Sequence, residues 1–232
     1  MNIQLRLRFI VRPKKPEYQT GKPHKVFSNL LAQDFSASAP NQKWCTDFTY
    51  LFLKGGEVRY NCTMIDLYDR SVVASITDRH ITSDLAIRTL GKALESQQGT
   101  IENLILHSDQ GSQYTSRAFT EYCVSAHVLQ SMSKAGYPYD NAPMERCFNT
   151  LKNECTNLYA FKTEEELSRV VEKFAYATYN HVRPTAIGHR IRHGCHTLLR
   201  RQHAPGLDWL TNQNRRRRFL SRTKPRSGAK HP

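Results

Sequence analysis

Three acidic residues lie where neighbouring segments could hold their carboxylates together. Asp47 lies inside the β-forming segment WCTDFTYL, Asp109 follows the short apolar run LIL, and Glu145 lies in DNAPMERCFNTLKNE. Oxygen ligands suit Mg²⁺ or Mn²⁺, and two such ions about 3.5–4 Å apart can activate an attacking oxygen and stabilise the leaving oxygen of a phosphodiester. The three residues are therefore candidate ligands of a divalent metal site.

Each of these acids also has an ordinary structural interpretation. Asp47 could be an ordinary strand residue, and Asp109 with the following Gln-Gly could form a turn. Glu145 could be an acid in the first turn of a helix, where the helix dipole stabilises negative charge. Asp66 and Asp69 in IDLYDR are rival carboxylates, and spacing alone does not exclude them. The choice between a metal site and these structural roles therefore depends on the sequence around the three acids.

Other reactive residue types give weaker signals. His107 is expected to pack in the end of a strand rather than to bind a ligand, and Ser112 has no evident His–Asp partners that would make it a nucleophile. The ten histidines show no HExxH spacing, and the six cysteines form no CxxC pair. These patterns argue against a zincin, a zinc ribbon or a redox motif.

Hydrophobic periodicity predicts the elements that must position the acids. Three strands with short connections indicate an antiparallel meander, and two further short strands each follow or precede a helix. The predicted order is βββαβαβαα, an α/β layered domain with one mixed sheet of five strands. The expected strands are 46–53, 58–67, 70–78, 103–107 and 128–132, and the expected helices are 83–94, 116–126, one from about 142 and one at 163–180. A fourth strand beside the first would bring Asp47 and Asp109 together.

The helix expected from residue 142 would supply the third carboxylate. Pro143 suits its first turn, where a missing N–H costs nothing. A polar stripe places Glu145 and Lys152 two turns apart. An apolar stripe, expected to face the core, contains Met144, Phe148, Leu151, Cys155 and Leu158.

The net charge of +14 is distributed unevenly along the 232 residues. Residues 1–43 carry eight Lys or Arg and two acids, residues 44–182 carry 13 and 17, and residues 183–232 carry 13 and one. Basic ends suggest a polyanion such as nucleic acid. We expect an N-terminal arm or linker at 1–43, a catalytic core at 44–182 and a basic tail at 183–232.

The chain shows no sign of secretion or of a membrane span. No run of 18 apolar residues exists, and the N-terminus has no small-residue cleavage site. Scattered cysteines in a chain of this size favour reduced thiols. The sequence therefore predicts a cytoplasmic protein without a membrane partner.

Three sequence blocks together resemble a known family. WCTDFTYL, HSDQGSQYTS and DNAPMERCFNTLKNE resemble the integrase core of DDE-type bacterial transposases of the insertion-sequence-3 family, within the retroviral-integrase superfamily. Thirty-five residues separate Asp109 from Glu145, which is the family's spacing, and Lys152 lies where the family has a basic residue. YNHVRP at 179–184 resembles the motif that follows the last helix. The resemblance runs from about Ala39 to Pro184.

The resemblance implies an RNase H-like fold with Asp47, Asp109 and Glu145 as the metal-binding catalytic triad. It implies Mg²⁺, with Mn²⁺ as a substitute, and hydrolytic nicking at element ends followed by attack of a 3′-hydroxyl on target DNA. A homo-oligomer on nucleoid DNA would be expected. By the same resemblance, 134–139 would form a flexible loop beside the site, and Gly111 would let the backbone turn away from Asp109. The implied DNA contacts are Gln110, Ser112, Gln113, Lys134, Asn141 and Lys152.

The chain departs from the family pattern at both ends. No helix-turn-helix segment is recognisable in residues 1–43, so recognition of element ends is expected to need a helix-turn-helix partner chain. After Arg183 the sequence reads Pro-Thr-Ala-Ile-Gly-His instead of the family's segment, which favours a tail that is frameshifted or disordered. The alternatives are a non-catalytic DNA-binding or regulatory transposase remnant, or an RNase H-like nuclease that only cuts.

Overall fold

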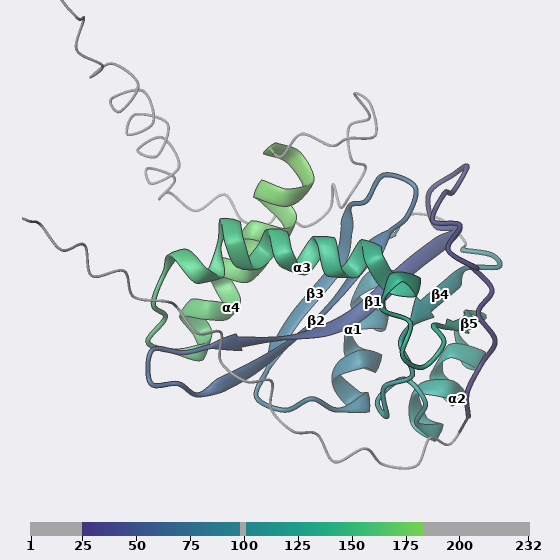
Figure 1. Ribbon diagram of the computed structural model, residues 1–232, viewed down its shortest axis with the longest axis horizontal. Helices are drawn as coiled ribbons and strands as arrows, with labels where there is room; N and C mark the ends of the chain where they lie inside the picture. The colour runs from purple at the N-terminus through teal and green to yellow at the C-terminus, as the bar shows by residue number, and fades with distance from the viewer. Residues whose placement is uncertain (1–24, 98–100, 183–232) are drawn as a thin grey trace, which may run out of the picture. The chain divides into compact units, whose positions relative to one another are not determined.

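A five-stranded mixed sheet forms the centre of the computed structural model, which describes residues 25–97 and 101–182 (Figure 1). The strand order is β3-β2-β1-β4-β5. β1 pairs antiparallel with β2 and parallel with β4, and β4 pairs parallel with β5. The strands are β1 (Lys43–Phe52), β2 (Val58–Asp66), β3 (Val72–Asp78), β4 (Ile105–Ser108) and β5 (Leu129–Met132). The predicted α/β class, strand sequence and placement of the fourth strand beside the first are confirmed.

Helices cover both faces of this sheet. They are α1 (Ser83–Glu95), α2 (Arg117–Ser125), α3 (Ala142–Glu154) and α4 (Glu164–Lys173), with 3₁₀ turns η1 (Pro138–Asn141) and η2 (Thr156–Leu158) and a π-helical segment η3 (Phe174–Val182). Side-chain oxygens cap three helix starts: Thr82 accepts from the amide of Leu85, and Ser116 and Thr163 cap α2 and α4 in the same way. Each such cap contributes about 1 kcal/mol to helix stability.

Two apolar cores form because successive side chains of a strand point to opposite faces. Cys45 packs with α3, α4 and η3 on one face, whereas Trp44 packs with α1 and α2 on the other. Both side chains are fully buried. Burial of a large apolar side chain stabilises the fold by about 1.5–3 kcal/mol, so this alternation fixes which face of β1 carries Asp47.

The described part of the expected N-terminal arm contacts the domain. Leu31 is 2% exposed and belongs to the first core. The amide of Leu30 donates to Oγ of Ser131 (2.8 Å), and the amide of Met132 donates to the carbonyl oxygen of Ser28 (3.3 Å). These contacts cover the outer edge of β5, which would otherwise be open to pairing with another strand. Residues 1–24 and the tail at 183–232 lie outside the described residues, so the expected arm and tail stay predictions there.

The long helices differ from the expectation near their C-terminal ends. α3 ends at Glu154, because Cys155 has φ −136° and ψ −78° and leaves the helical conformation. Leu158 therefore does not continue the apolar stripe and is 56% exposed. The helix expected at about 163–180 is present as α4 followed directly by η3, and the wider π-helical winding after Lys173 places Tyr176 and Tyr179 in the core.

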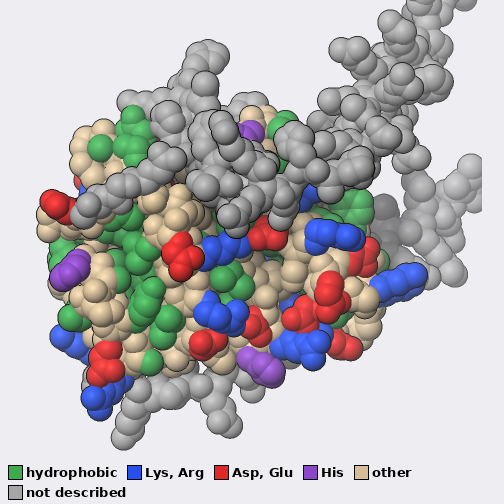
Figure 2. All heavy atoms as spheres, turned by 180° about the vertical axis from the view of Figure 1, so that it is seen from behind, with side chains coloured by type: hydrophobic (Ala, Val, Ile, Leu, Met, Phe, Trp, Pro, Cys, Tyr) green, Lys and Arg blue, Asp and Glu red, His purple; other side chains and the backbone are tan. Residues whose placement is uncertain are grey.

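The surface of the described residues mixes both charge signs. Figure 2 shows acidic and basic side chains interspersed on the face opposite to the view of Figure 1. Ion pairs join Arg79 to Glu164 and Lys92 to Glu172. Among residues 25–97 and 101–182 there is no helix with the length and apolar character that crossing a bilayer requires.

Candidate functional site

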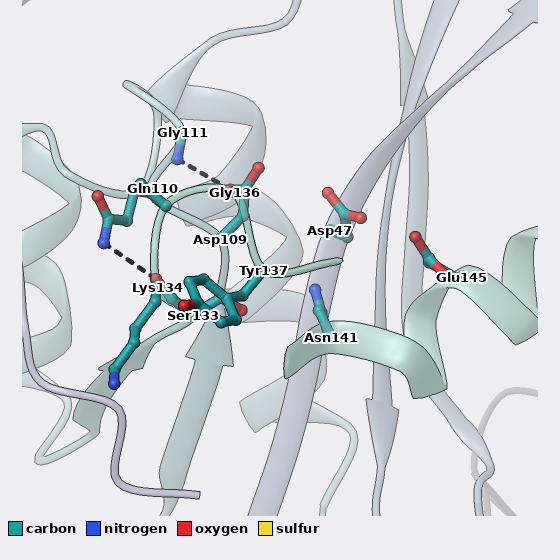
Figure 3. A pocket seen from close by; sticks show the side chains of 11 residues that line it. Asp47, Asp109, Gln110, Gly111, Ser133, Lys134, Gly136, Tyr137, Asn141 and Glu145 are labelled. Carbon is teal, nitrogen blue, oxygen red and sulfur yellow. Dashed lines mark hydrogen bonds between the residues drawn. The ribbon is translucent and has the colours of Figure 1, made fainter. Parts of the chain in front are cut away.

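The three candidate acids line one pocket with a volume of about 470 Å³ (Figure 3). Asp47 comes from the middle of β1, Asp109 from the residue after β4, and Glu145 from the first turn of α3. Figure 3 shows Asp47 between the other two side chains. The remaining lining residues are Gln110, Gly111, Ser133, Lys134, Ala135, Gly136, Tyr137 and Asn141. Folding therefore brings these three residues, which are far apart in the sequence, to the same pocket.

Sheet pairing fixes the position of Asp47. The residue pairs with Thr63 of β2, and its Oδ1 accepts from the amide of Phe48 (2.7 Å). The side chain is half-buried, whereas Glu145 is exposed at the helix start. Glu145 lies in the first turn of α3, where a carboxylate interacts favourably with the helix dipole.

Asp109 is held by the turn that follows β4. Its Oδ1 accepts from the amide of Gly111 (2.9 Å). The protein atoms around the carboxyl group raise its pKa above the ordinary value, and the Gly111 amide opposes this shift. The residue nevertheless keeps solvent exposure within the open pocket. A cation bound near this carboxyl group would stabilise its charged form.

Glycine suits position 111 for a different reason from the one expected. Its φ lies outside the left-handed region, so the turn itself does not demand glycine. A Cβ at this position would instead lie 2.9 Å from Oδ1 of Asp109 and 3.1 Å from Oε1 of Gln113. The absence of a side chain lets the backbone amide approach the carboxylate.

Asn141 connects the start of α3 to β1 beside Asp47. It is 6% exposed, and its Nδ2 donates to the carbonyl oxygen of Thr46 (3.1 Å). Although Asn141 is the N-cap residue, its side chain forms no capping bond. Its Oδ1 is buried and has no hydrogen-bond partner among the described residues. An unpartnered buried acceptor is costly, and this one belongs to a side chain that lines the pocket.

One wall of the pocket is formed by residues after β5. Nε2 of Gln110 donates to the carbonyl oxygen of Ser133 (3.0 Å), and Nζ of Lys134 lies 6.0 Å from the ring centroid of Tyr137. The sequence placed the loop at 134–139 beside the site but omitted Ser133. Parallel pairing of β4 with β5 would have indicated Ser133, because the C-terminal ends of both strands lie at the same edge of the sheet.

Three expected site residues do not line this pocket. Lys152 lies on α3 with its Nζ 5.2 Å from the ring centroid of Tyr50. Ser112 is exposed, and Gln113 is half-buried beside Gly111. Gln110, Lys134 and Asn141 do line it. The expected contacts therefore separate into pocket residues and residues outside it.

The rival residues have structural roles. Asp66 is 3% exposed and accepts from the amides of Asn41 and Tyr68 and from Nε1 of Trp44. Both ring nitrogens of His107 contact serine hydroxyls, at 2.8 Å from Ser131 and 3.1 Å from Ser133. None of these side chains lines the pocket, as expected for His107.

The donor chemistry of the pocket fits a hard divalent cation. The three carboxylates that line the pocket offer oxygen ligands, which Mg²⁺ and Mn²⁺ prefer. In the part of the chain that the structure describes, no three His, Cys, Asp or Glu residues lie close enough together to hold a metal ion. Metal binding at this pocket therefore requires the three carboxylates to approach one another.

Two family models, each described as an integrase core domain, match residues 37–138 and 126–190. Together they span the sheet, the pocket and the helices that follow it. All three acids fall within the matched residues.

Two curated relatives are similar in sequence. The chain is 36% identical over 182 residues to an uncharacterized 31 kDa protein of insertion element IS600 from Shigella sonnei, covering 78% of this chain and 66% of that protein. It is 37% identical over 155 residues to the transposase InsF for insertion sequence IS3A from Escherichia coli (strain K12), covering 67% of this chain and 53% of InsF. The chain thus spans between half and two thirds of the length of these relatives.

A solved structure shares the fold. A chain of the simian T-cell lymphotropic virus intasome in complex with PP2A regulatory subunit B56 gamma matches with a TM-score of 0.52 and 19% identity. The match covers 93% of this chain and 64% of that one. The likeness supports the RNase H-like fold expected from the sequence.

Proposed function

Because this chain belongs to the integrase core family that includes transposases of IS3-type insertion sequences, we propose that it is the catalytic part of a DDE transposase. Its reaction would be metal-dependent cleavage at the ends of a DNA element and transfer of the new 3′ ends to target DNA. The observation that carries this proposal is the single pocket lined by Asp47, Asp109 and Glu145.

We assign the metal-binding role to these three carboxylates. They would hold Mg²⁺, with Mn²⁺ as a substitute, and three converging carboxylates need such a cation because their charges repel. When bound, the metal supplies activation of the attacking oxygen and neutralisation of charge on the phosphodiester. The carboxylates orient the reacting groups, and the Gly111 amide holds Asp109 toward the pocket.

An open pocket suits DNA as the substrate. Glu145 and Asp109 are solvent-exposed, so a polymeric substrate can reach them from outside. Gln110, Lys134 and Asn141 would contact the strand that enters the pocket. Lys152 and the loop residues Ser112 and Gln113 would contact the same DNA outside it.

The carboxylates are expected to converge when metal and DNA bind together. Asp47 is fixed by β1, whereas Glu145 is an exposed side chain with several rotatable bonds. The phosphate of a bound strand can share the cation and so offset the cost of bringing the three charges together. We therefore expect weak metal binding by the free protein and tighter binding with DNA.

Assembly and recognition of element ends belong to the same proposal. A transposase must hold two element ends, so we expect at least a dimer on DNA. The described residues include no helix-turn-helix beyond the sheet-covering helices, so a partner chain or segment would read the end sequence.

A strand-transfer assay tests the proposed function. An oligonucleotide with the element's end sequence is incubated with target DNA and Mg²⁺, with Glu145→Gln as the inactive comparison. Joined strands that depend on Glu145 support the transposase. Cut but unjoined strands would indicate a nuclease, and binding without either product would indicate the regulatory remnant.

A further inference from the structure

Asp140 is a buried carboxylate that the proposed metal chemistry does not use. It is 4% exposed and lies five residues before Glu145. Oδ2 accepts from Nδ2 of Asn29 (3.0 Å) and from the amide of Lys134 (3.1 Å), and Oδ1 accepts from Nε2 of Gln33 (2.9 Å). The bond to Lys134 closes the segment 134–140 on itself, and the other two join it to a distant part of the chain.

The distant part is a turn at residues 29–33. Oδ1 of Asn29 accepts from the amides of Leu31 and Ala32, at 3.1 and 2.9 Å. Ala32 and Gln33 have φ of 46° and 64°. The left-handed conformation is unfavourable for residues with a side chain, and such conformations persist where the surroundings over-determine them.

Both ends of this arrangement are anchored. Leu31 is buried in the first core, and the amide of Leu30 bonds to Ser131 of β5. On the other side, the residue after Asp140 is Asn141, whose bond to the Thr46 carbonyl places the start of α3 beside Asp47. The 29–33 turn is thus joined through Asp140 to the pocket wall and to the helix that carries Glu145.

We propose that the 29–33 turn and Asp140 form a latch that holds the pocket wall at 134–140 in its productive position. Asp140 is a positioning residue, because it acts through the wall and the start of α3 and does not line the pocket. Gln33 is the exposed element of the latch, so changes there alter the connection with little effect on the core. This inference rests on the proposed function for its consequence in catalysis.

Because Asp140 is negatively charged, substitutions that change the charge of Gln33 can test the latch. Gln33→Glu replaces the amide donor with a carboxylate that repels Asp140, whereas Gln33→Lys supplies a cationic donor to the same oxygen. Gln42→Ala is a matched control, because Gln42 lies in the same segment and its Oε1 accepts from Ser38 and Ala39, away from Asp140. Gln33→Glu in an Asp140→Asn background shows whether the effect passes through Asp140.

Two readouts are measured on the full chain. In Gln33→Glu, amide hydrogen exchange in 134–140 should rise by about tenfold or more, while kcat for strand transfer falls about fivefold or more and KM for DNA changes less than about twofold. Gln33→Lys and Gln42→Ala should match the wild type in both. In the Asp140→Asn background, Gln33→Glu should add nothing further.

Unchanged exchange in Gln33→Glu would overturn the latch, as would an effect of equal size in the Asp140→Asn background. Faster exchange with unchanged kcat would overturn the positioning role. If the wild-type chain joins no strands under any condition, the proposed function fails, and hydrogen exchange alone then decides whether the latch exists.

Discussion

The amide of Gly111 donates a 2.9 Å hydrogen bond to Oδ1 of Asp109, and a Cβ on residue 111 would lie at the same distance of 2.9 Å from that oxygen. A real Cβ does not approach so closely, so a side chain at 111 would require the Asp109 carboxylate to shift. The position of the Asp109 carboxylate in the pocket is therefore sensitive to a side chain two residues away.

Gly111→Ala is expected to reduce strand transfer by about tenfold or more, since displacement of a reacting group by about 1 Å can cost a hundredfold. The added methyl group pushes the Asp109 carboxylate away from its amide. The unfolding free energy should change by less than about 1 kcal/mol, because φ at 111 suits alanine and the unfolded chain loses entropy. Rates are measured on DNA, and stability by urea denaturation.

Gly55→Ala is the matched control for that substitution. Gly55 has no positive φ, and nothing lies within 4 Å of a Cβ built there. It should keep wild-type activity. Equal activity of Gly111→Ala and Gly55→Ala would contradict the role assigned to the close approach.

The three acids are expected to be unfavourable for stability in metal-free buffer. Asp47→Asn, Asp109→Asn and Glu145→Gln each remove one negative charge from the pocket, so in EDTA each variant should be at least as stable as the wild type by thermal unfolding. Each should also abolish strand transfer, by about a hundredfold or more. Glu121→Gln, which alters only an exposed surface pair with Arg117, should do neither. A variant that is clearly less stable would indicate a structural role for that acid.

Lys152 is expected to contribute a phosphate contact from outside the pocket. Lys152→Ala should weaken binding to DNA of any sequence and lower the slope of log affinity against log salt by about one. Lys152→Arg should retain the slope, and Lys162→Ala, which removes a positive charge from an exposed residue, serves as the control. A slope that does not differ between the two alanine variants would remove Lys152 from the DNA contacts.

Buried thiols should be inert in the folded protein. Burial raises the pKa of Cys45 to about 12 and that of Cys62 to about 11. At pH 8 the thiolate fraction of Cys45 is then about one in ten thousand, compared with roughly a quarter for a thiol of pKa about 8.5. In a Cys195→Ser background, native protein should resist alkylation at pH 8, whereas denatured protein exposes the five described thiols. Rapid labelling of native protein would contradict this burial.

Much of the fold could be predicted because local patterns agreed with tertiary structure. The five strands expected from hydrophobic periodicity and the helix expected from residue 142 with Pro143 in its first turn all have counterparts in the structure. The end of α3 could not be predicted, because residues 155–161 contain neither glycine nor proline to mark it. The π-helical winding of η3 has no distinguishing pattern of its own in the sequence.

Part of the candidate site could be predicted, because the sequence indicates where strands end and where helices begin. Asp109 and Glu145 lie at such positions, and β1 pairs with β4 as expected. The latch at Asp140 could not be foreseen, because residues 29–33 lie about 110 positions away and show no periodicity. Its evidence is a set of side-chain hydrogen bonds that only the folded chain brings together.

The most direct test of the metal assignment is an EPR titration of Mn²⁺ into the full chain with an element-end oligonucleotide present. Wild-type protein and Asp66→Asn should bind Mn²⁺, whereas Asp109→Asn and Glu145→Gln should lose binding, with circular dichroism to confirm that each sample is folded. Equal Mn²⁺ binding by the wild type, Asp109→Asn and Glu145→Gln, or none by folded wild type, would contradict the assignment of the pocket as a metal site.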